Sequence, residues 1–131
     1  MMRILFVCVG NAGRSQMAEA LFNHLVQGKA IALSAGTNPA ERVDPSVTKV
    51  MQETGIDISG NRPKMLAPEM KEQADKVITM GCGVEGVCPA TFVETEDWGV
   101  EDPRCKPIDR VREIRDVIKK KVIRLIEEMA N

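Results

Sequence analysis

The chain has 131 residues, of which 18 are basic and 19 acidic, and its formal net charge is −1. This length fits one domain, residues 1–131, that can bury a core without disulfide or metal staples. The balanced charge and the low aromatic content (three Phe, one Trp, no Tyr) argue against binding of nucleic acid. No apolar run approaches the roughly 20 residues of a membrane span, and the first residues lack the pattern of a secretory signal. We therefore expect a cytoplasmic protein whose four cysteines serve catalysis, redox chemistry or metal binding.

Short apolar runs alternate with helical periodicities along the chain. Strands are predicted over 3–7, 30–34, 76–80 and 92–94, and helices over 15–26, 44–54, 68–74 and 109–129. Asp44-Pro45 is typical of a helix start, and a loop is expected over 97–107. This order predicts an α/β fold: a single doubly wound domain, with a four-stranded parallel sheet and helices on both faces. The functional site of such a fold lies at the carboxyl ends of the strands.

The strongest functional signal lies where the first predicted strand meets the first predicted helix. Cys8 and Arg14 have five residues between them, and the intervening residues are small. Backbone N–H groups of such a loop and of a helix N-terminus form a concave anion site. Gly10, Asn11 and Gly13 are residues that tolerate positive φ, and the two glycines permit the backbone dihedrals that aim these donors inward. We predict an oxyanion cradle made of Val9, Gly10, Asn11, Ala12, Gly13, Arg14 and Ser15.

Cys8 is the expected nucleophile of this site. The positive surroundings favour its thiolate, and Ser15 would donate a hydrogen bond to that thiolate. Arg14 would clamp two oxygens of the anion with its planar guanidinium, while Asn11 would brace the loop. The alternative is a buried strand-end cysteine beside a glycine turn and a surface arginine. That alternative leaves the common placement of all three features at one strand–loop–helix junction unexplained.

At this point the sequence resembles a known family. Residues 8–20, CVGNAGRSQMAEA, are similar to the opening of the thioredoxin-coupled arsenate reductases and of the related low-molecular-weight protein tyrosine phosphatases. The similarity continues in order at residues 34–37, 55–59, 77–80 and 98–103. It implies a phosphatase-like fold, an arsenate or phosphate oxyanion as substrate, a role in arsenical resistance, no cofactor and a monomer.

The resemblance also implies how electrons reach arsenate. Cys8 would attack arsenate, and Cys82 would attack the adduct, which releases arsenite and leaves a Cys8–Cys82 disulfide. Cys88 would then attack Cys82 and free Cys8. Thioredoxin or a similar dithiol reductant would reduce the resulting Cys82–Cys88 disulfide by thiol–disulfide exchange. The glycines around these two cysteines would permit the movement that successive disulfides need.

Two departures from the family pattern concern the cysteines. Cys82 and Cys88 have five residues between them, where the reductases have six. Cys105 is an additional thiol, which we interpret as a bystander, with the alternative that it replaces Cys88 as the resolving partner. A further alternative is that Cys82 and Cys88 only pack or bind a metal, although the chain has no Cys-x-x-Cys motif and a single histidine.

No metal site is predicted. Some members of the family bind potassium through a carboxylate together with residues that match Asn11, Glu19 and Ser34. Lys64 stands at the position of that carboxylate, and an ammonium group repels a cation.

Asp102, next to Pro103, resembles the general acid of the family, which protonates the oxygen that leaves arsenic or phosphorus. Without the resemblance, it is typical of a turn in a solvated acidic loop. Two alternatives to arsenate reduction follow. One is a low-molecular-weight protein tyrosine or small-molecule phosphatase that uses Cys8, Arg14 and Asp102, although no tyrosine follows the Asp-Pro pair to grip an aromatic substrate. The other is an oxyanion-binding thiol redox sensor without turnover.

Overall fold

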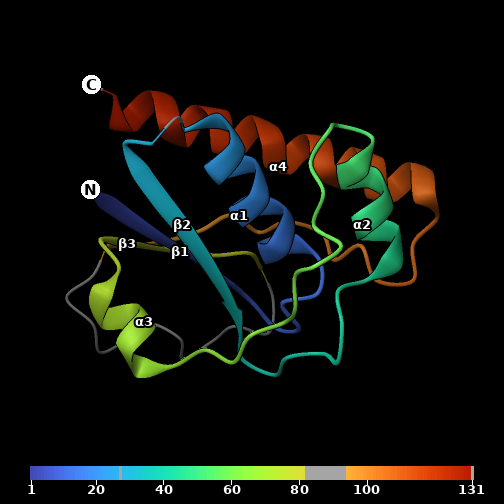
Figure 1. The fold of residues 1–131 in the computed structure, drawn as a ribbon, viewed down its shortest axis with the longest axis horizontal. Coiled ribbons are helices and arrows are strands. Elements are labelled where there is room, and N and C mark those ends of the chain that lie inside the picture. The colour runs from blue at the N-terminus through green and yellow to red at the C-terminus, as the bar shows by residue number, and fades with distance from the viewer. Residues whose placement is uncertain (27, 82–93, 131) are drawn as a thin grey trace.

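A computed structural model describes residues 1–26, 28–81 and 94–130. All four strands of its sheet are parallel and lie in the order β2-β1-β3-β4 (Figure 1). The strands are β1 (Met2–Cys8), β2 (Ala30–Gly36), β3 (Lys76–Thr79) and β4 (Glu94–Asp97). Because β1 pairs with β2 on one side and with β3 on the other, the strand order reverses at β1. This topology confirms the predicted doubly wound parallel sheet.

In the described ranges four helices connect or follow the strands: α1 (Arg14–Leu25), α2 (Pro45–Gln52), α3 (Pro68–Gln73) and α4 (Ile108–Met129). The start of α2 confirms the Asp-Pro prediction, since the Asp44 carboxylate accepts a hydrogen bond from the Ser46 N–H at 3.0 Å. Within the described ranges, no helix is both long enough and apolar enough to cross a membrane.

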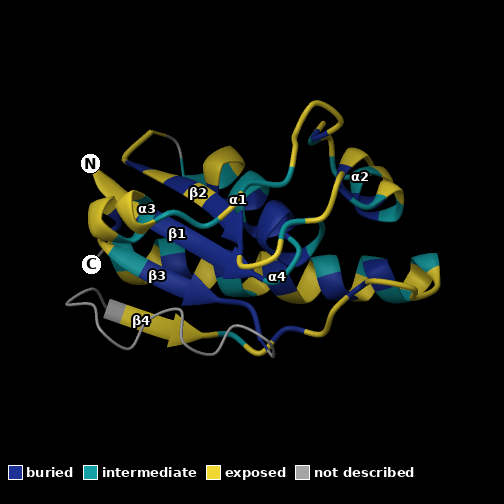
Figure 2. Ribbon diagram, turned by 90° about the horizontal axis from the view of Figure 1, so that it is seen from below, coloured by how far each residue is buried: buried dark blue, intermediate teal, exposed yellow. Residues whose placement is uncertain are grey.

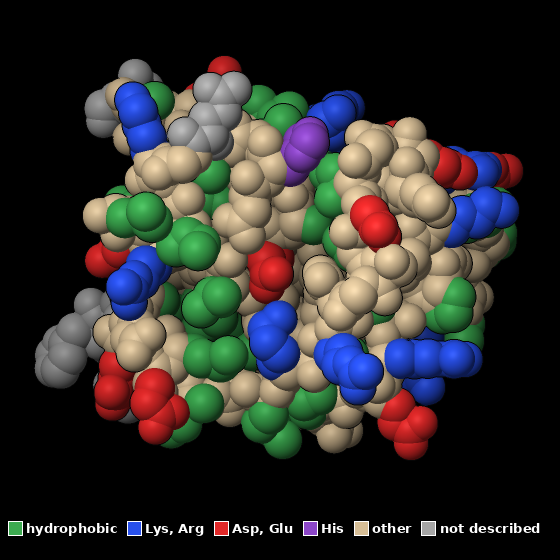
Figure 3. All heavy atoms as spheres, viewed as in Figure 1, with side chains coloured by type: hydrophobic (Ala, Val, Ile, Leu, Met, Phe, Trp, Pro, Cys, Tyr) green, Lys and Arg blue, Asp and Glu red, His purple; other side chains and the backbone are tan. Residues whose placement is uncertain are grey.

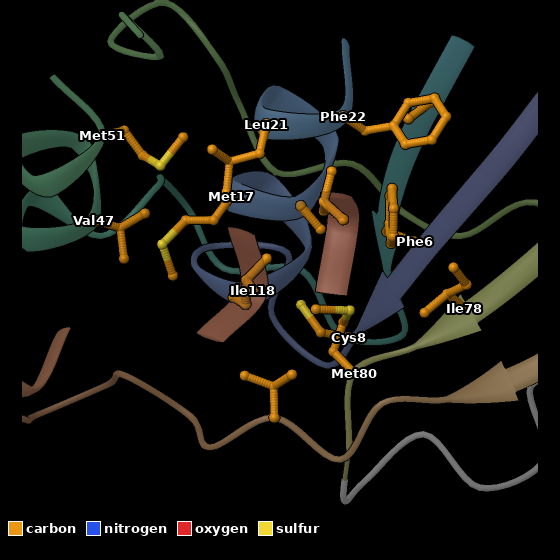
Figure 4. Close-up of a cluster of buried hydrophobic side chains, with 14 of the residues drawn as sticks. Phe6, Cys8, Met17, Leu21, Phe22, Val47, Met51, Ile78, Met80 and Ile118 are labelled. Atoms are coloured by element: carbon orange, nitrogen blue, oxygen red, sulfur yellow. The ribbon is translucent and has the colours of Figure 1, made fainter. Parts of the chain in front are cut away.

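Helices α1, α2 and α4 enclose the larger of two hydrophobic cores against one face of the sheet (Figures 1 and 4). The Phe6 ring of β1 meets the Phe22 ring of α1 edge to face, with 6.2 Å between centroids. The apolar stripe of α4 is buried here, with Met129 at its end only partly buried: Val111, Ile114, Ile118, Val122 and Leu125. Cys8 belongs to this core and lies beside Met80 in Figure 4. The residue that ends β1 is therefore held by close packing.

The opposite face of the sheet is covered more thinly. Helix α3 has no fully buried residue, and the cluster beneath it is small: Leu5, Val7, Ala35, Ala74 and Val77. On β2, Ile31 and Leu33 remain 42% and 44% exposed. Figure 3 shows apolar side chains gathered on the face where β2 and α3 lie. The larger core on the α1 side therefore supports most of the fold.

The fourth strand differs from the prediction. It was expected over 92–94, whereas β4 covers Glu94–Asp97 and Asp97 is part of it instead of opening a loop. Phe92 lies outside the described residues. β4 is an edge strand that pairs only with β3, and Thr95, Glu96 and Asp97 are exposed (Figure 2). These exposed residues are polar and carry no hydrophobic alternation, so the sequence pattern does not mark the strand.

Candidate active site

The loop between β1 and α1 lies where the carboxyl ends of three strands meet. The Met80 N–H, directly after β3, donates to the carbonyl of Val7 at 2.9 Å. On the other side, the chain that follows β2 runs along the loop, and the Asn38 N–H donates to the Val9 carbonyl at 2.9 Å. We call residues 8–15 the anion loop. Its position matches the strand-end site expected of a doubly wound sheet.

The Cys8 thiol lies at the centre of the anion loop and is 2% exposed. Its sulfur is 2.8 Å from the hydroxyl oxygen of Ser15 and accepts a hydrogen bond from the Asn11 N–H at 3.2 Å. Ser15 and Asn11 are both fully buried. The sulfur therefore lies within hydrogen-bond distance of one backbone N–H and one hydroxyl group.

The backbone of the anion loop has one residue with positive φ. Neither Gly10 nor Gly13 has a positive φ, whereas Asn11 does, at 50°. Asparagine is one of the few non-glycine residues that tolerate this conformation. Glycine is required elsewhere for space: a Cβ added at Gly36 of β2 would lie 2.6 Å from the Val9 carbonyl oxygen. The close approach of β2 to the loop, which the sequence did not indicate, is therefore possible because Gly36 has no side chain.

The Asn11 side chain connects the anion loop to two other segments. Its amide nitrogen donates to the Ser15 hydroxyl at 2.7 Å. Its amide oxygen accepts from the Lys64 backbone N–H at 2.8 Å and from the Gln16 side chain at 3.0 Å. Gln16 is fully buried and also donates to the Arg62 carbonyl at 3.3 Å. Sequence reasoning missed Gln16. A glutamine that supports the loop through Asn11 has no sequence signal that distinguishes it from other glutamines in a helix.

A charged group lies beneath this network. The Lys64 ammonium is 3.5 Å from a carboxylate oxygen of Glu19, and the same oxygen accepts a hydrogen bond from the Ser34 hydroxyl at 2.7 Å. The Glu19 side chain is only 17% exposed, so Lys64 offsets a mostly buried negative charge. In the part of the chain that the structure describes, no group of three His, Cys, Asp or Glu side chains is placed to hold a metal ion.

Arg14 opens α1, and its side chain is largely buried, with 8% exposed. One terminal nitrogen, Nη1, donates to the carbonyls of Met80 at 3.3 Å and of Val100 at 3.1 Å. These bonds fix the guanidinium plane at the rim of the anion loop. The first hydrogen bond within α1 runs from the Met17 N–H to the Gly13 carbonyl. The N–H groups that precede it in the first turn of the helix therefore have no intrahelical partner, which is typical of an anion site.

The backbone at Gly81 packs against Arg14. Gly81 has φ 135°, and a Cβ at this position would lie 3.1 Å from Arg14 Nη1 and 3.1 Å from the Val100 carbonyl oxygen. Glycine is therefore needed both for the conformation and for the close approach. Cys82, the next residue in the chain, and Cys88 lie outside the described residues.

The second wall of the site is residues 99–106, which we call the acid loop. One oxygen of Asp102 lies 3.8 Å from Arg14 Nη2, and the other accepts the Arg104 N–H at 3.0 Å. Asp102 thus forms the turn expected of an Asp-Pro pair and also faces the arginine of the anion loop. Its side chain is 57% exposed, so a substrate can reach it. Cys105 is exposed and, unlike Asp102, does not line the cleft.

A surface ion pair links the acid loop to α4, and a second one lies within the loop. The Glu101 carboxylate pairs with the Arg110 guanidinium and lies 3.7 Å from the Lys106 ammonium. The hydrogen bonds from Arg110, and its positive charge, keep the pKa of the Glu101 carboxyl below its usual range. Pro103 is buried against Gly13, since a Cβ at Gly13 would lie 3.0 Å from the Pro103 ring.

Together the walls enclose a cleft of about 630 Å³ above Cys8. The described residues that line it come from the anion loop, from the segment after β2 and from the acid loop: Cys8, Val9, Gly10, Ala12, Gly13, Arg14, Asn38, Pro39, Ala40, Arg42, Asp44, Pro45, Asp102, Pro103 and Arg104. Asn11 and Ser15 lie beneath this surface and support it. A nucleophilic thiol, a guanidinium and a carboxyl group therefore share one open cleft.

Comparison with known proteins agrees with this geometry. Residues 3–131 match the low molecular weight phosphotyrosine protein phosphatase family. The chain belongs to this family. It is 36% identical to an arsenate reductase from Bacillus cereus over 126 residues, which cover 95% of this chain and 93% of the relative.

Two solved structures of the family show the same fold. The YwlE arginine phosphatase from Geobacillus stearothermophilus has a TM-score of 0.88 at 30% identity, covering 99% of this chain and 94% of that one. A thioredoxin-dependent arsenate reductase from Corynebacterium glutamicum has a TM-score of 0.86 at 36% identity, covering 99% of this chain and 62% of that one. The family thus includes both hydrolytic and reductive enzymes, so the fold leaves the reaction of this chain open.

Proposed function

We propose that the protein reduces arsenate to arsenite with a relay of Cys8, Cys82 and Cys88, and that a thioredoxin-type dithiol regenerates it. The observation that carries the proposal is the contact between Gly81 and Arg14. The chain that leaves the oxyanion site at Gly81 continues directly into Cys82. The reductase from Corynebacterium glutamicum, which is described as thioredoxin-dependent, supports the choice of reductant.

In the first step the Cys8 thiolate attacks the arsenic of arsenate. A sulfur–arsenic bond forms, and one oxygen leaves as water after it takes a proton from Asp102. Arg14 and the N–H groups of the anion loop hold the remaining oxygens, whose negative charge these donors stabilise. The position of Asp102 beside Arg14, with 3.8 Å between the charged atoms, supports its role as the proton donor.

The next two steps transfer two electrons. The Cys82 thiolate attacks the sulfur of Cys8, and the sulfur–arsenic bond breaks with its electron pair left on arsenic, which departs as arsenite. The Cys88 thiolate then attacks Cys82 and releases the Cys8 thiolate. The external dithiol reduces the Cys82–Cys88 disulfide and becomes oxidised itself.

Cysteine substitutions test the relay. Cys82→Ser is expected to abolish arsenite formation with thioredoxin as reductant and to leave hydrolysis of p-nitrophenyl phosphate intact, whereas Cys8→Ser removes both activities. Cys105→Ser is the matched control and should change neither, since the exposed Cys105 does not line the cleft.

Peptide mapping after one arsenate turnover without reductant identifies the resolving cysteine. We expect a Cys82–Cys88 disulfide. A Cys82–Cys105 disulfide would assign the last exchange to Cys105 instead. Arsenate reduction that survives Cys82→Ser would overturn the relay.

A further inference from the structure

We propose that the cleft contains a second anion subsite, formed by Arg42 and Arg104, and that Cys8 also hydrolyses small aliphatic phosphate monoesters that carry a second anionic group. This activity goes beyond arsenate reduction, because it needs Cys8 but neither Cys82 nor Cys88. It rests on the size of the cleft, the charges of its walls and the chemistry of its lining.

The cleft is much larger than a tetrahedral oxyanion. Its volume of about 630 Å³ falls within the range of about 300–1,000 Å³ that is typical of sites for larger organic ligands. An ion with five heavy atoms occupies only the floor, where the anion loop lies. The remaining space extends between the walls and can hold the organic part of an ester.

The segment after β2 and the acid loop, which form the two walls of the cleft, each carry one arginine without an ion pair among the described residues. Arg42 lies in the segment after β2, which backbone hydrogen bonds fix to the anion loop: Asn38 to Val9, Ala40 to Gly10 and Asp44 to Ala12, each at 2.9 Å. Arg104 lies in the acid loop, next to Pro103, which packs on Gly13. Both arginines are exposed and line the cleft. Two segments that are each attached to the anion loop therefore contribute an arginine to the same cleft.

Among the described residues, neither the Arg42 nor the Arg104 guanidinium has an ion pair or a side-chain hydrogen bond. The surface arginines of α4 differ, since Arg110, Arg112 and Arg115 each pair with a carboxylate. The acidic residues of the cleft are already engaged: Asp44 caps α2 through the Ser46 N–H and hydroxyl, at 3.0 and 2.9 Å. Asp102 accepts the Arg104 N–H and faces Arg14. The rim thus offers two free guanidinium groups, which favour carboxylate or phosphate.

The lining also indicates the class of the organic group. None of the described residues that line the cleft is aromatic, so none of them offers a stacking partner to a phenyl ring. The apolar surface comes from small or compact residues, chiefly Pro39, Ala40, Pro45 and Pro103. A short aliphatic chain that ends in a carboxylate or a second phosphate matches this combination better than an aryl group.

The hydrolysis that we propose uses the residues already placed around Cys8. The Cys8 thiolate attacks phosphorus, the ester oxygen leaves as an alcohol with a proton from Asp102, and a phosphocysteine remains. Water then attacks phosphorus, the sulfur–phosphorus bond breaks, and inorganic phosphate and the Cys8 thiolate are released. No oxidant or reductant is consumed.

A matched pair of esters tests the subsite. 3-Phosphoglycerate and glycerol 3-phosphate share a three-carbon chain and a phosphate, and only the first has a carboxylate at the other end. We expect kcat/KM for 3-phosphoglycerate to exceed that for glycerol 3-phosphate by about tenfold, which corresponds to about 1.4 kcal/mol. In an Arg42→Gln/Arg104→Gln variant the ratio should fall to about one, while glycerol 3-phosphate hydrolysis and arsenate reduction are largely retained.

Three further variants make the result decisive. Arg124→Gln, at an 83% exposed side chain on α4, should keep the wild-type ratio, and so should Cys82→Ser, which separates this proposal from the relay. Dissociation constants of the two esters for Cys8→Ser, with and without the Arg42→Gln and Arg104→Gln substitutions, test the subsite separately from turnover. A wild type that hydrolyses neither ester overturns the proposed hydrolysis. The subsite is overturned if the wild type does not prefer 3-phosphoglycerate to glycerol 3-phosphate. It is also overturned if this preference survives in the Arg42→Gln/Arg104→Gln variant.

Discussion

The anion loop and the acid loop border the same thiol but are held in different ways. The anion loop is fixed from within, because Asn11 and Ser15 are fully buried and hydrogen-bonded and Arg14 is anchored to two carbonyls. The acid loop is fixed from outside, by the packing of Pro103 and by surface ion pairs of Glu101.

This difference separates two tasks of the site. Donors that are rigid before the substrate arrives stabilise developing charge without reorganisation, and they serve any reaction that begins with attack by Cys8. A proton donor on an exposed loop serves only the departure of an oxygen and can adjust to different leaving groups. We therefore expect substitutions in the anion loop to lower all activities. Substitutions in the acid loop should lower the rate by a factor that depends on the leaving group.

The largest effect is expected from Asn11→Ala. The substitution removes the hydrogen bonds that Asn11 makes to Ser15, Gln16 and Lys64 and places alanine at a φ of 50°. Unfolding by denaturant should show a loss of about 3 kcal/mol, as unpaired buried polar groups and backbone strain add up. Both arsenate reduction and ester hydrolysis should fall roughly 100-fold or more.

Asn11→Gly is the control for the backbone at this position, since glycine adopts positive φ without strain. It should be more stable than Asn11→Ala by about 1 kcal/mol and still lack the amide contacts. Wild-type stability and activity in Asn11→Ala would show that the loop does not depend on this network.

A smaller and selective effect is expected from Asp102→Asn. The substitution removes the proton donor, so kcat/KM for phenyl phosphate should fall by about 100-fold. p-Nitrophenyl phosphate should be affected much less, because p-nitrophenolate leaves without a proton. Asp116→Asn on α4, whose side chain is equally exposed at 57%, should change neither rate. Equal losses with both esters would argue that Asp102 only shapes the turn.

The two loops also differ in how far sequence predicted them. The anion loop follows from local pattern, because a buried run, a small-residue turn and a helix start are contiguous in the chain. The contacts that fix the anion loop come from distant segments, and no local signal marks them. Examples are the hydrogen bond from the Lys64 N–H to Asn11 and the close approach of Gly36 to the Val9 carbonyl. Three residues of the loop, Gly10, Asn11 and Gly13, tolerate positive φ, and local sequence does not indicate which of them adopts it. The structure has this conformation at Asn11.

Near the acid loop, local pattern was less informative. β4, which leads into it, has no buried face and was misplaced. The role of Asp102 was expected only from the family resemblance, because an Asp-Pro pair in an acidic segment is typical of an ordinary turn. Its position beside Arg14 is a contact between residues that are distant in the sequence, which local pattern does not indicate.

Lys64→Met tests the support beneath the anion loop, and we expect a moderate effect. Without the ammonium, the Ser34 hydroxyl is the one remaining partner of the Glu19 carboxylate among the described residues, and the Glu19 side chain is 17% exposed. The free energy of unfolding at neutral pH should fall by about 1 kcal/mol, between the values for exposed and buried pairs. Adding Glu19→Gln should restore part of this loss. If the double variant is less stable than Lys64→Met, the carboxylate is stabilised by something other than the lysine charge.

The smallest effect is expected from Glu101→Gln, which weakens the link between the acid loop and α4. The pKa of the Glu101 carboxyl is lowered by Arg110, so the folded state binds this proton less tightly than the unfolded chain. The stabilisation is therefore fully present above the ordinary carboxyl pKa of about 4.3 and is lost as the pH falls through the lower folded value. The Tm of the wild type should exceed that of Glu101→Gln at pH 7, and the difference should shrink below about pH 4. Glu113→Gln, which removes the other partner of Arg110, controls for the arginine. A Tm difference that persists at low pH would assign the anchoring of the acid loop to the packing of Pro103 against Gly13 and not to the ion pair.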